Sequence, residues 1–231
     1  MKLAKCFAAF ALAGLIAVPA ANATISVSYG WEDGTGTILS SFGNLVDPTN
    51  VSGVQPRIEG GLAVSDVPGP NSGNRYLHVA EDPHDSTPQA YVAFIEGLTD
   101  GDIINASFYG YDDTSGGPSM RIWGHYATSG DVDSYNGSAG GNSTYTVDTG
   151  WNQVAHSWTF DSSGGTRDAL VIELRLYSDP STSDPNHTDY FVDDLYVEVS
   201  NDAATITVAP EPASLALLGL GGLAVLRRRR R

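Results

Sequence analysis

The most informative segment of the chain reads Asp168-Ala169-Leu170-Val171-Ile172-Glu173-Leu174-Arg175-Leu176-Tyr177. Successive side chains of a β-strand point to opposite faces. One face of this segment would carry Leu170, Ile172, Leu174 and Leu176, and the other Val171, Glu173, Arg175 and Tyr177. The pattern predicts an antiparallel strand that buries one face in a core and turns the other outward.

Two further segments alternate in the same way. Met120, Ile122, Gly124 and Tyr126 alternate with Arg121, Trp123 and His125, and Ser107, Tyr109 and Tyr111 alternate with Ala106, Phe108 and Gly110. Helical periodicity is nearly absent, and turn-forming residues divide the chain into short pieces. We expect strands near 25–31, 62–66, 75–80, 89–96, 103–111, 118–127, 143–147, 153–160, 168–177 and 189–199. About ten short strands predict an all-β fold, a two-sheet antiparallel β-sandwich.

The body of the chain is strongly acidic. Between Thr24 and Ala209, five arginines and no lysine stand against 26 acidic residues, a net charge of about −21. Such a surface repels nucleic acid and anionic membranes and attracts divalent cations. Cysteine is absent after Cys6, so the exported protein is held by its core or by metal, not by disulfides.

The motifs of several enzyme classes are missing. The chain has no G-x-S-x-G, no H-E-x-x-H and no P-loop, and its histidines lack zinc-site spacing. The pairs Asp112-Asp113 and Asp193-Asp194 are neighbours on one strand, so their carboxylates point to opposite faces instead of facing each other as in glycosidases. The sequence therefore favours a protein that is not an enzyme.

Both ends read as targeting segments. Residues 1–23 combine Lys2 and Lys5 with an apolar run and end in Ala21-Asn22-Ala23. This pattern indicates a secretory signal peptide that is cleaved after Ala23. An uncleaved anchor helix is the alternative.

The C-terminal segment begins Val208-Ala209-Pro210-Glu211-Pro212, continues without a charge over 213–226, and closes with five arginines. We expect a short transmembrane helix over 213–226 with the arginines on the cytoplasmic side. A buried helix at a domain end is the alternative. Residues 24–199 would form the sandwich domain, and 200–207 a linker to this segment.

The three-part tail at 208–231 resembles the PEP-CTERM sorting signal of Gram-negative bacteria. The resemblance implies that an exosortase, a membrane protease-transpeptidase, recognises Pro210, Glu211 and Pro212 during export. The protein would be anchored in the membrane transiently and then reside at the cell surface or in the extracellular matrix. Cargo of this family is associated with biofilm rich in exopolysaccharide.

The body resembles jelly-roll carbohydrate-binding modules of the CBM4/9 kind. The resemblance rests on Gly30-Trp31-Glu32-Asp33-Gly34, Arg75-Tyr76-Leu77-His78-Val79, Gly97-Leu98-Thr99-Asp100-Gly101-Asp102, Gly150-Trp151-Asn152-Gln153-Val154 and Tyr190-Phe191-Val192-Asp193-Asp194-Leu195. It implies a jelly-roll sandwich, a structural calcium ion and glycan binding. Trp31 and His78 depart from the family pattern, which has Phe and a basic residue there.

A calcium ion (Ca2+) is expected at one end of the sandwich. Alternation places Asp193 on the core-facing row with Phe191, Leu195, Val197 and Val199. An unpaired buried carboxylate is costly, and oxygen ligands suit Ca²⁺. The family pattern pairs Asp193 with Glu32; Asp33 and Asp194 are runners-up. The alternative is that Asp193 lies beyond the edge of the core, in water.

A ligand face is expected on one exposed sheet. Aromatic rings offer apolar area for sugar C–H faces, while Arg and Glu supply the donors and acceptors that hydroxyls need. The predicted face consists of Tyr109, Tyr111, Arg121, Trp123, His125, Glu173, Arg175 and Tyr177. The same residues could form a protein interface, or ordinary core if another element covers them.

Three functions remain open. The first is a non-catalytic surface module that binds extracellular polysaccharide. The second is a structural or adhesive matrix protein with no specific glycan ligand. The third is a glycan-active enzyme.

Overall fold

The computed structural model describes residues 23–34, 37–46, 57–60, 68–81, 87–112, 119–142, 150–177 and 188–208. This part contains thirteen strands and no helix. No helix within it is long and apolar enough to cross a membrane. Residues 1–22 of the signal peptide expected at 1–23, the helix expected at 213–226 and the strands expected at 62–66 and 143–147 lie outside the described residues.

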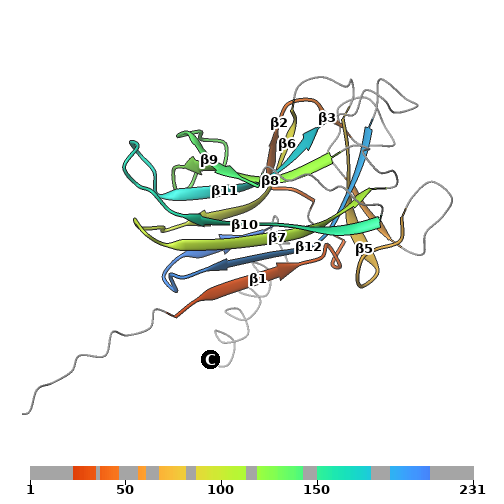
Figure 1. The fold of residues 1–231 in the computed structure, drawn as a ribbon, viewed down its shortest axis with the longest axis horizontal. Helices are drawn as coiled ribbons and strands as arrows, with labels where there is room; N and C mark the ends of the chain where they lie inside the picture. The colour runs from red at the N-terminus through yellow and green to blue at the C-terminus, as the bar shows by residue number, and fades with distance from the viewer. Residues whose placement is uncertain are drawn as a thin grey trace, which may run out of the picture.

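The strands form two antiparallel sheets that stack as two layers (Figure 1). Sheet A has the order β10 (Gly150–Thr159), β7 (Ile103–Asp112), β12 (Thr188–Val199), β5 (Arg75–Glu81) and β3 (Leu45–Val46), with β1 (Ile25–Tyr29) on β12 and β4 (Arg57–Gly60) on β5. Sheet B has the order β13 (Thr205–Thr207), β6 (Gln89–Glu96), β11 (Ala169–Tyr177), β8 (Ser119–Ala127) and β9 (Ser138–Gly141), with β2 (Ser40–Phe42) on β6. The predicted all-β, two-sheet antiparallel sandwich is confirmed.

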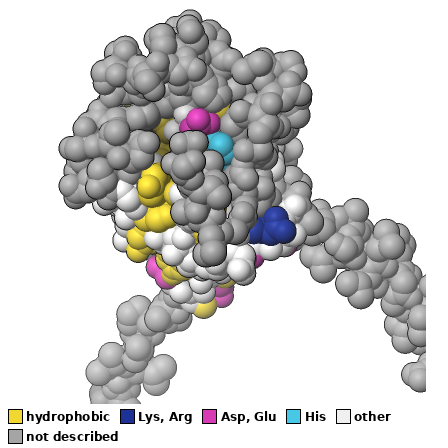
Figure 2. All heavy atoms as spheres, turned by 90° about the vertical axis from the view of Figure 1, so that its right-hand side faces the viewer, with side chains coloured by type: hydrophobic (Ala, Val, Ile, Leu, Met, Phe, Trp, Pro, Cys, Tyr) yellow, Lys and Arg dark blue, Asp and Glu magenta, His cyan; other side chains and the backbone are white. Residues whose placement is uncertain are grey.

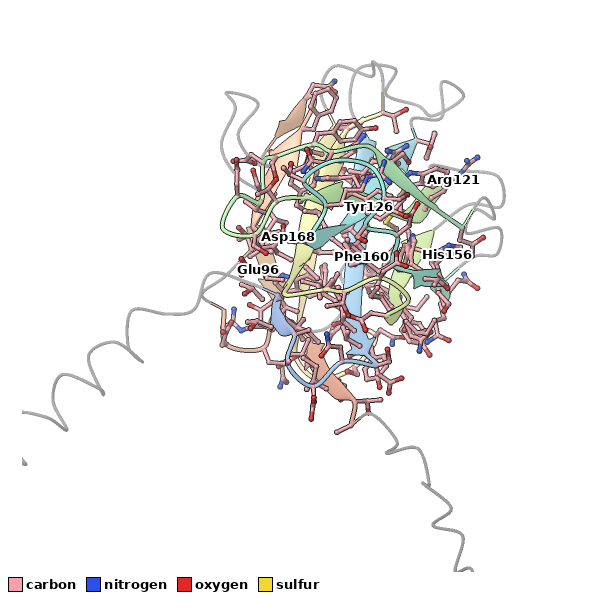
Figure 3. The ribbon with its side chains drawn as sticks, turned by 90° about the vertical axis from the view of Figure 1, so that its left-hand side faces the viewer. Glu96, Arg121, Tyr126, His156, Phe160 and Asp168 are labelled. Carbon is pink, nitrogen blue, oxygen red and sulfur yellow. The ribbon has the colours of Figure 1, made fainter. Side chains whose placement is uncertain are left out.

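The core lies between the sheets and follows the predicted alternation. On β11 the even-numbered residues Leu170, Ile172, Leu174 and Leu176 enter it, as do Met120, Ile122 and Tyr126 of β8 and Ala106 and Phe108 of β7. Figure 3 views the end of the sandwich at which β8 turns into β9, with Tyr126 and Phe160 lying between the layers. Their rings pack edge to face, 5.6 Å apart. The odd-numbered residues of β8 and β11 are therefore on the outer face of sheet B.

The predicted strands with described coordinates are all present, with small shifts at their ends. Five short strands, β2, β3, β4, β9 and β13, were not predicted. The last of them corrects the linker expected at 200–207. β13 pairs with β6 through Thr205, Ile206 and Thr207, and Ile206 and Val208 pack against the main core. The domain therefore continues to the start of the sorting tail.

A bulge in β12 corrects the expected side of Asp193. Tyr190 and Val192 enter the core before it, and Leu195, Val197 and Val199 after it. Asp194 and Leu195 stand opposite Phe108 alone, so the parity of the strand shifts by one residue. Asp193 instead lies opposite Tyr109, whose strand turns Phe108 into the core. Asp193 does not share the row of Leu195, yet it is fully buried.

Candidate functional site

The outer face of sheet B holds a buried carboxylate–imidazole pair at its centre. Glu173 on β11 and His125 on β8 are 0% and 1% exposed. The Nδ1 atom of His125 lies 2.5 Å from Glu173 Oε1, and the Nε group of Arg175 donates to Glu173 Oε2 at 2.7 Å. One carboxylate therefore receives a donor on each of its oxygens. Fixing both oxygens keeps the Glu173 side chain in one orientation.

Two arginine–aromatic stacks extend this pair along the sheet. The guanidinium of Arg175 lies 4.6 Å from the ring centroid of Trp123, and that of Arg121 lies 4.5 Å from the ring centroid of Tyr177. The Trp123 indole N–H donates to Ser138 Oγ on β9 at 2.8 Å. Six of the eight predicted ligand residues, Arg121, Trp123, His125, Glu173, Arg175 and Tyr177, thus lie together on this face.

The other end of the same face is closed by apolar packing. Tyr91, Phe94, Ala127, Ala169 and Val171 form a second, small cluster outside the sandwich, against which Leu39 and Val132 pack. The ring of Tyr91 meets His125 edge-on at 5.0 Å. Burial, with the nearby charge of Glu173, raises the pKa of Tyr91 to about 12. The Tyr91 hydroxyl therefore stays neutral at physiological pH.

The two remaining predicted residues, Tyr109 and Tyr111, lie on the other sheet. They belong to β7 of sheet A, whereas β8 and β11 belong to sheet B. The expectation that all eight residues share one sheet is wrong, because β7 and β8 follow each other in sequence but pair in opposite layers.

Tyr111 instead joins an aromatic cluster on the outer face of sheet A. Its ring contacts Trp151 at 5.4 Å and Phe191 at 6.1 Å, and both of these also contact Tyr76. His78 stacks on Phe191, and its Nε2 lies 2.8 Å from Asp189 Oδ1. Figure 2 views the end of the molecule near β5 and shows a histidine and an acidic side chain beside each other among hydrophobic ones.

The predicted calcium residues converge on one turn, residues 71–75. Asp193 Oδ2 accepts from the amides of Asn71 and Ser72 at 2.9 and 3.1 Å, and its Oδ1 accepts from the amide of Asp194 at 2.7 Å. The side chain of Asp194 accepts from Asn71 Nδ2 and Ser72 Oγ. Glu32 Oε1 accepts from the amides of residues 74 and 75 at 2.7 and 2.9 Å.

The ionisation of these acids follows from their surroundings. The backbone amides of Asn74 and Arg75 hold the pKa of Glu32 below its ordinary value. Burial raises the pKa of Asp193 to about 6, against the opposing effect of its amide donors. The two non-glycine residues with left-handed φ in the described part, Trp31 at 56° and Asp194 at 51°, adjoin Glu32 and Asp193.

Carboxylate oxygens, which Ca²⁺ prefers as ligands, are thus gathered beside the turn at 71–75. Asp33, the other runner-up, accepts from the Tyr29 hydroxyl. In the described ranges, however, no three His, Cys, Asp or Glu side chains are grouped so as to hold a metal ion. The acids face backbone amides and side-chain donors instead.

Sequence reasoning missed the residues that surround the central pair. Tyr91 and Tyr135 both contact the ring of His125, and Ser138 orients Trp123. Tyr91 lies within a nearly continuous apolar strand, so alternation gave no sign that it faces outward. Tyr135 lies in the polar segment between β8 and β9. An aromatic residue in an otherwise polar loop was the one signal that could have marked it as a functional residue.

Comparisons with known proteins identify the tail of the chain. Residues 208–231 match the PEP-CTERM protein-sorting motif, so the resemblance drawn from the sequence is confirmed. The motif implies exosortase-type processing and an exported, cell-surface or extracellular location. A sequence comparison with curated proteins finds no match.

Solved structures similar to this fold include carbohydrate-binding modules. The CBM22-1 xylan-binding domain of Paenibacillus barcinonensis Xyn10C is 12% identical, with a TM-score of 0.44 over 77% of this chain and 95% of that one. The CBM22-2 domain of the same protein is 17% identical, with a TM-score of 0.43 over 74% and 97%. A cyclase from Fischerella sp. TAU is 9% identical, with a TM-score of 0.46 over 76% and 98%. Likeness at this level does not say what the present chain binds or catalyses.

Proposed function

We propose that this is an exported, non-catalytic surface or matrix protein that binds extracellular polysaccharide through the outer face of sheet B. The binding residues are those that the fold brings together there: Arg121, Trp123, His125, Glu173, Arg175 and Tyr177. Tyr109 and Tyr111 are not part of this site, because they lie on the opposite sheet.

The observation that carries the proposal is a fully buried carboxylate on the outside of the sandwich. Glu173 occupies the outer row of β11 and is 0% exposed. Burying a charge is unfavourable unless it is paired, and replacing such a pair by packed apolar side chains is often neutral or stabilising. A fold-stabilising role alone therefore gives little reason for this pair, whereas a site that needs a fixed acceptor does.

The chemistry of the face suits a hydroxyl-rich ligand. Among the described residues, the Arg175 guanidinium donates through Nε only, which leaves its terminal N–H groups for a ligand. Trp123 and Tyr177 are partly exposed and supply apolar ring area. Paired donors and acceptors beside aromatic rings are what sugars require, and the acidic body disfavours anionic polymers. A neutral polysaccharide is the expected ligand class.

The sorting motif supports an exported location for the protein. We expect cleavage after Ala23 and a second cut at or near Pro210-Glu211-Pro212, with the segment 213–226 anchoring the chain in the membrane until then. We further propose that the processed protein resides in the biofilm matrix of a Gram-negative bacterium. The intact mass of the exported protein tests it, since a product that retains the five terminal arginines contradicts exosortase processing.

A structural or adhesive role is the second candidate, and one observation favours it. The two partly exposed rings each carry an arginine, Arg175 on Trp123 and Arg121 on Tyr177. Aromatic residues with arginine are also enriched in protein interfaces. In that case the face would bind another protein of the matrix, and no polysaccharide would compete. A glycan-active enzyme is the third candidate.

Binding assays with matched variants separate these candidates. Wild type should retain a neutral polysaccharide in affinity electrophoresis, and Trp123→Ala and Arg175→Ala should lose retention while still unfolding cooperatively. Tyr109→Ala, an aromatic removal on sheet A, should bind as wild type does. If no polysaccharide in a broad panel retains the wild type, glycan binding is refuted. Release of reducing ends during the assay would instead favour the enzyme.

We further propose that Ca²⁺ stabilises the end of the sandwich formed by Glu32 and Asp193, with Asp33 and Asp194 as further candidate ligands. Binding would require one or more of the amide contacts to the turn at 71–75 to be exchanged for the ion. A ligand that binds only the native state raises stability by mass action. If EDTA and added CaCl₂ give the same melting temperature, in wild type and in Asp193→Ala alike, the calcium proposal is wrong.

A further inference from the structure

The ring of His125 contacts the rings of two tyrosines. Tyr91 meets it edge-on from β6 at 5.0 Å, and Tyr135 lies tilted against it at 5.5 Å. The two covers differ, since Tyr91 is buried and Tyr135 is 65% exposed. The imidazole, which is 1% exposed, is therefore covered in part by a side chain of the packed sheet and in part by one that is mostly in solvent.

The hydrogen bonding of the imidazole is one-sided. Nδ1 faces Glu173, whose other oxygen is already taken by Arg175. A carboxylate accepts hydrogen bonds, so Nδ1 carries the donated proton and Nε2 of the neutral ring presents a lone pair. Nε2 is buried and has no hydrogen-bond partner within the described part of the chain. A buried polar atom without a partner is costly and requires an explanation.

The loop 128–137, which carries Tyr135, is held by hydrogen bonds at both of its ends. Glu96 and Asp168, which lie near each other in Figure 3, accept from the amides of Gly130 and Ser129. Further along, Asn136 donates from its backbone to Tyr126 O and from its side chain to Thr166 O. No hydrogen bond from the described residues holds the Tyr135 hydroxyl. The Tyr135 side chain can therefore turn away without unfolding the loop, since exposed side chains change rotamer within nanoseconds.

We propose that Tyr135 is a removable cover, and that its displacement opens His125 Nε2 as the acceptor for a hydroxyl group of the bound ligand. This inference deepens the proposed polysaccharide site and rests on it. Glu173 acts as the positioning residue, because it holds the ring so that Nε2 points away from the carboxylate. The ligand group is a neutral hydroxyl donor, which replaces the missing partner of Nε2.

The cover is tested without any ligand. Diethyl pyrocarbonate acylates an accessible, unprotonated imidazole nitrogen, and peptide mass spectrometry resolves His125 from the other histidines. His125 should react slowly in wild type and in Tyr135→Phe, which keeps the ring. It should react several-fold faster in Tyr135→Ala. Equal rates in Tyr135→Phe and Tyr135→Ala would overturn the idea of a cover.

The acceptor is tested with His125→Asn, whose amide can still donate to Glu173 but leaves no acceptor at the Nε2 position. Binding should weaken about three- to tenfold, the effect of one net hydrogen bond. If His125→Asn binds as wild type does while Trp123→Ala does not, the acceptor role fails and the polysaccharide site stands. If wild type retains no polysaccharide, both fail.

A second measurement covers the case in which His125→Asn does not fold. In Tyr135→Ala, a saturating concentration of the retained polysaccharide should protect His125 from diethyl pyrocarbonate, whereas a polysaccharide that wild type does not retain should give no protection. Binding without protection would mean that the ligand does not reach Nε2, and would overturn the inference.

Discussion

The buried carboxylate of Asp193 makes a prediction about stability that can be given a sign and a size. Asp193 is fully buried beneath the turn at 71–75 and accepts three backbone amide bonds. Burial favours the neutral acid, whereas amide donors favour the carboxylate. Burial is the larger effect, and the pKa rises from 3.8 to about 6. The native state therefore holds this proton more tightly than the unfolded chain does.

The direction of the pH dependence follows. Because the folded pKa lies above the unfolded one, the contribution to stability is fully present below about pH 4 and is lost as the pH rises through about 6. A shift of roughly two units corresponds to about 3 kcal/mol in the free energy of unfolding. Asp193→Asn removes the titration and leaves the other carboxyl groups in place, so the difference between the two proteins isolates it.

Urea unfolding followed by tryptophan fluorescence supplies the measurement, since Trp31 and Trp158 are buried. Wild type should lose about 3 kcal/mol relative to Asp193→Asn between about pH 4 and pH 8 in EDTA. A difference of the opposite sign would show that the amide donors outweigh burial, and would refute the reasoning. Added CaCl₂ should reverse the sign if Ca²⁺ binds here, because the ion favours the carboxylate.

Three further outcomes are expected. Glu173→Ala, which strips His125 and Arg175 of their shared carboxylate, should lower the free energy of unfolding by about 3–5 kcal/mol, and Glu173→Gln by less; urea titration compares them. In Gly141→Ala the new Cβ would lie 2.2 Å from Ile122 O and 2.6 Å from Trp123 Cα. The free energy of unfolding should therefore fall by about 1–3 kcal/mol, and the melting temperature with it. An unchanged melting temperature would mean that β9 shifts to accommodate the methyl group without cost. Ending the chain at Ser200 should destabilise the domain through loss of β13, whereas ending it at Val208 should not, as thermal unfolding would show.

Alternation was sufficient to predict which sides of β8 and β11 face the core. Leu170 and Leu174 enter the core while Glu173 and Arg175 turn outward, because side chains in a regular strand alternate strictly. The same reasoning could not assign strands to sheets. Tyr109 and Trp123 have equivalent patterns, but their strands pair in opposite layers. Strand pairing depends on contacts between segments distant in sequence, which a periodicity does not contain.

Two local features also escaped sequence analysis, for different reasons. The bulge at Asp194 reverses the parity of β12, and a left-handed Asp is tolerated without a distinctive sequence. β13 is only three residues long, Thr205-Ile206-Thr207, too short to show a period. Its place in the sheet is set by the edge of β6, which the sequence does not reveal.

The position of β13 has a mechanical consequence. The sorting motif begins at Val208, directly after this strand. Tension applied to the tail therefore reaches the domain through three residue pairs, Thr205 with Glu96, Ile206 with Ile95 and Thr207 with Phe94. These bonds, with the packing of Ile206 and Val208, form the first barrier to forced unfolding, which is governed by a rate and not by equilibrium stability. Detachment of β13 would uncover one edge of β6 but leave β11 and β8 paired beyond it. Under tension, the face that we propose binds polysaccharide would therefore stay folded after β13 has detached.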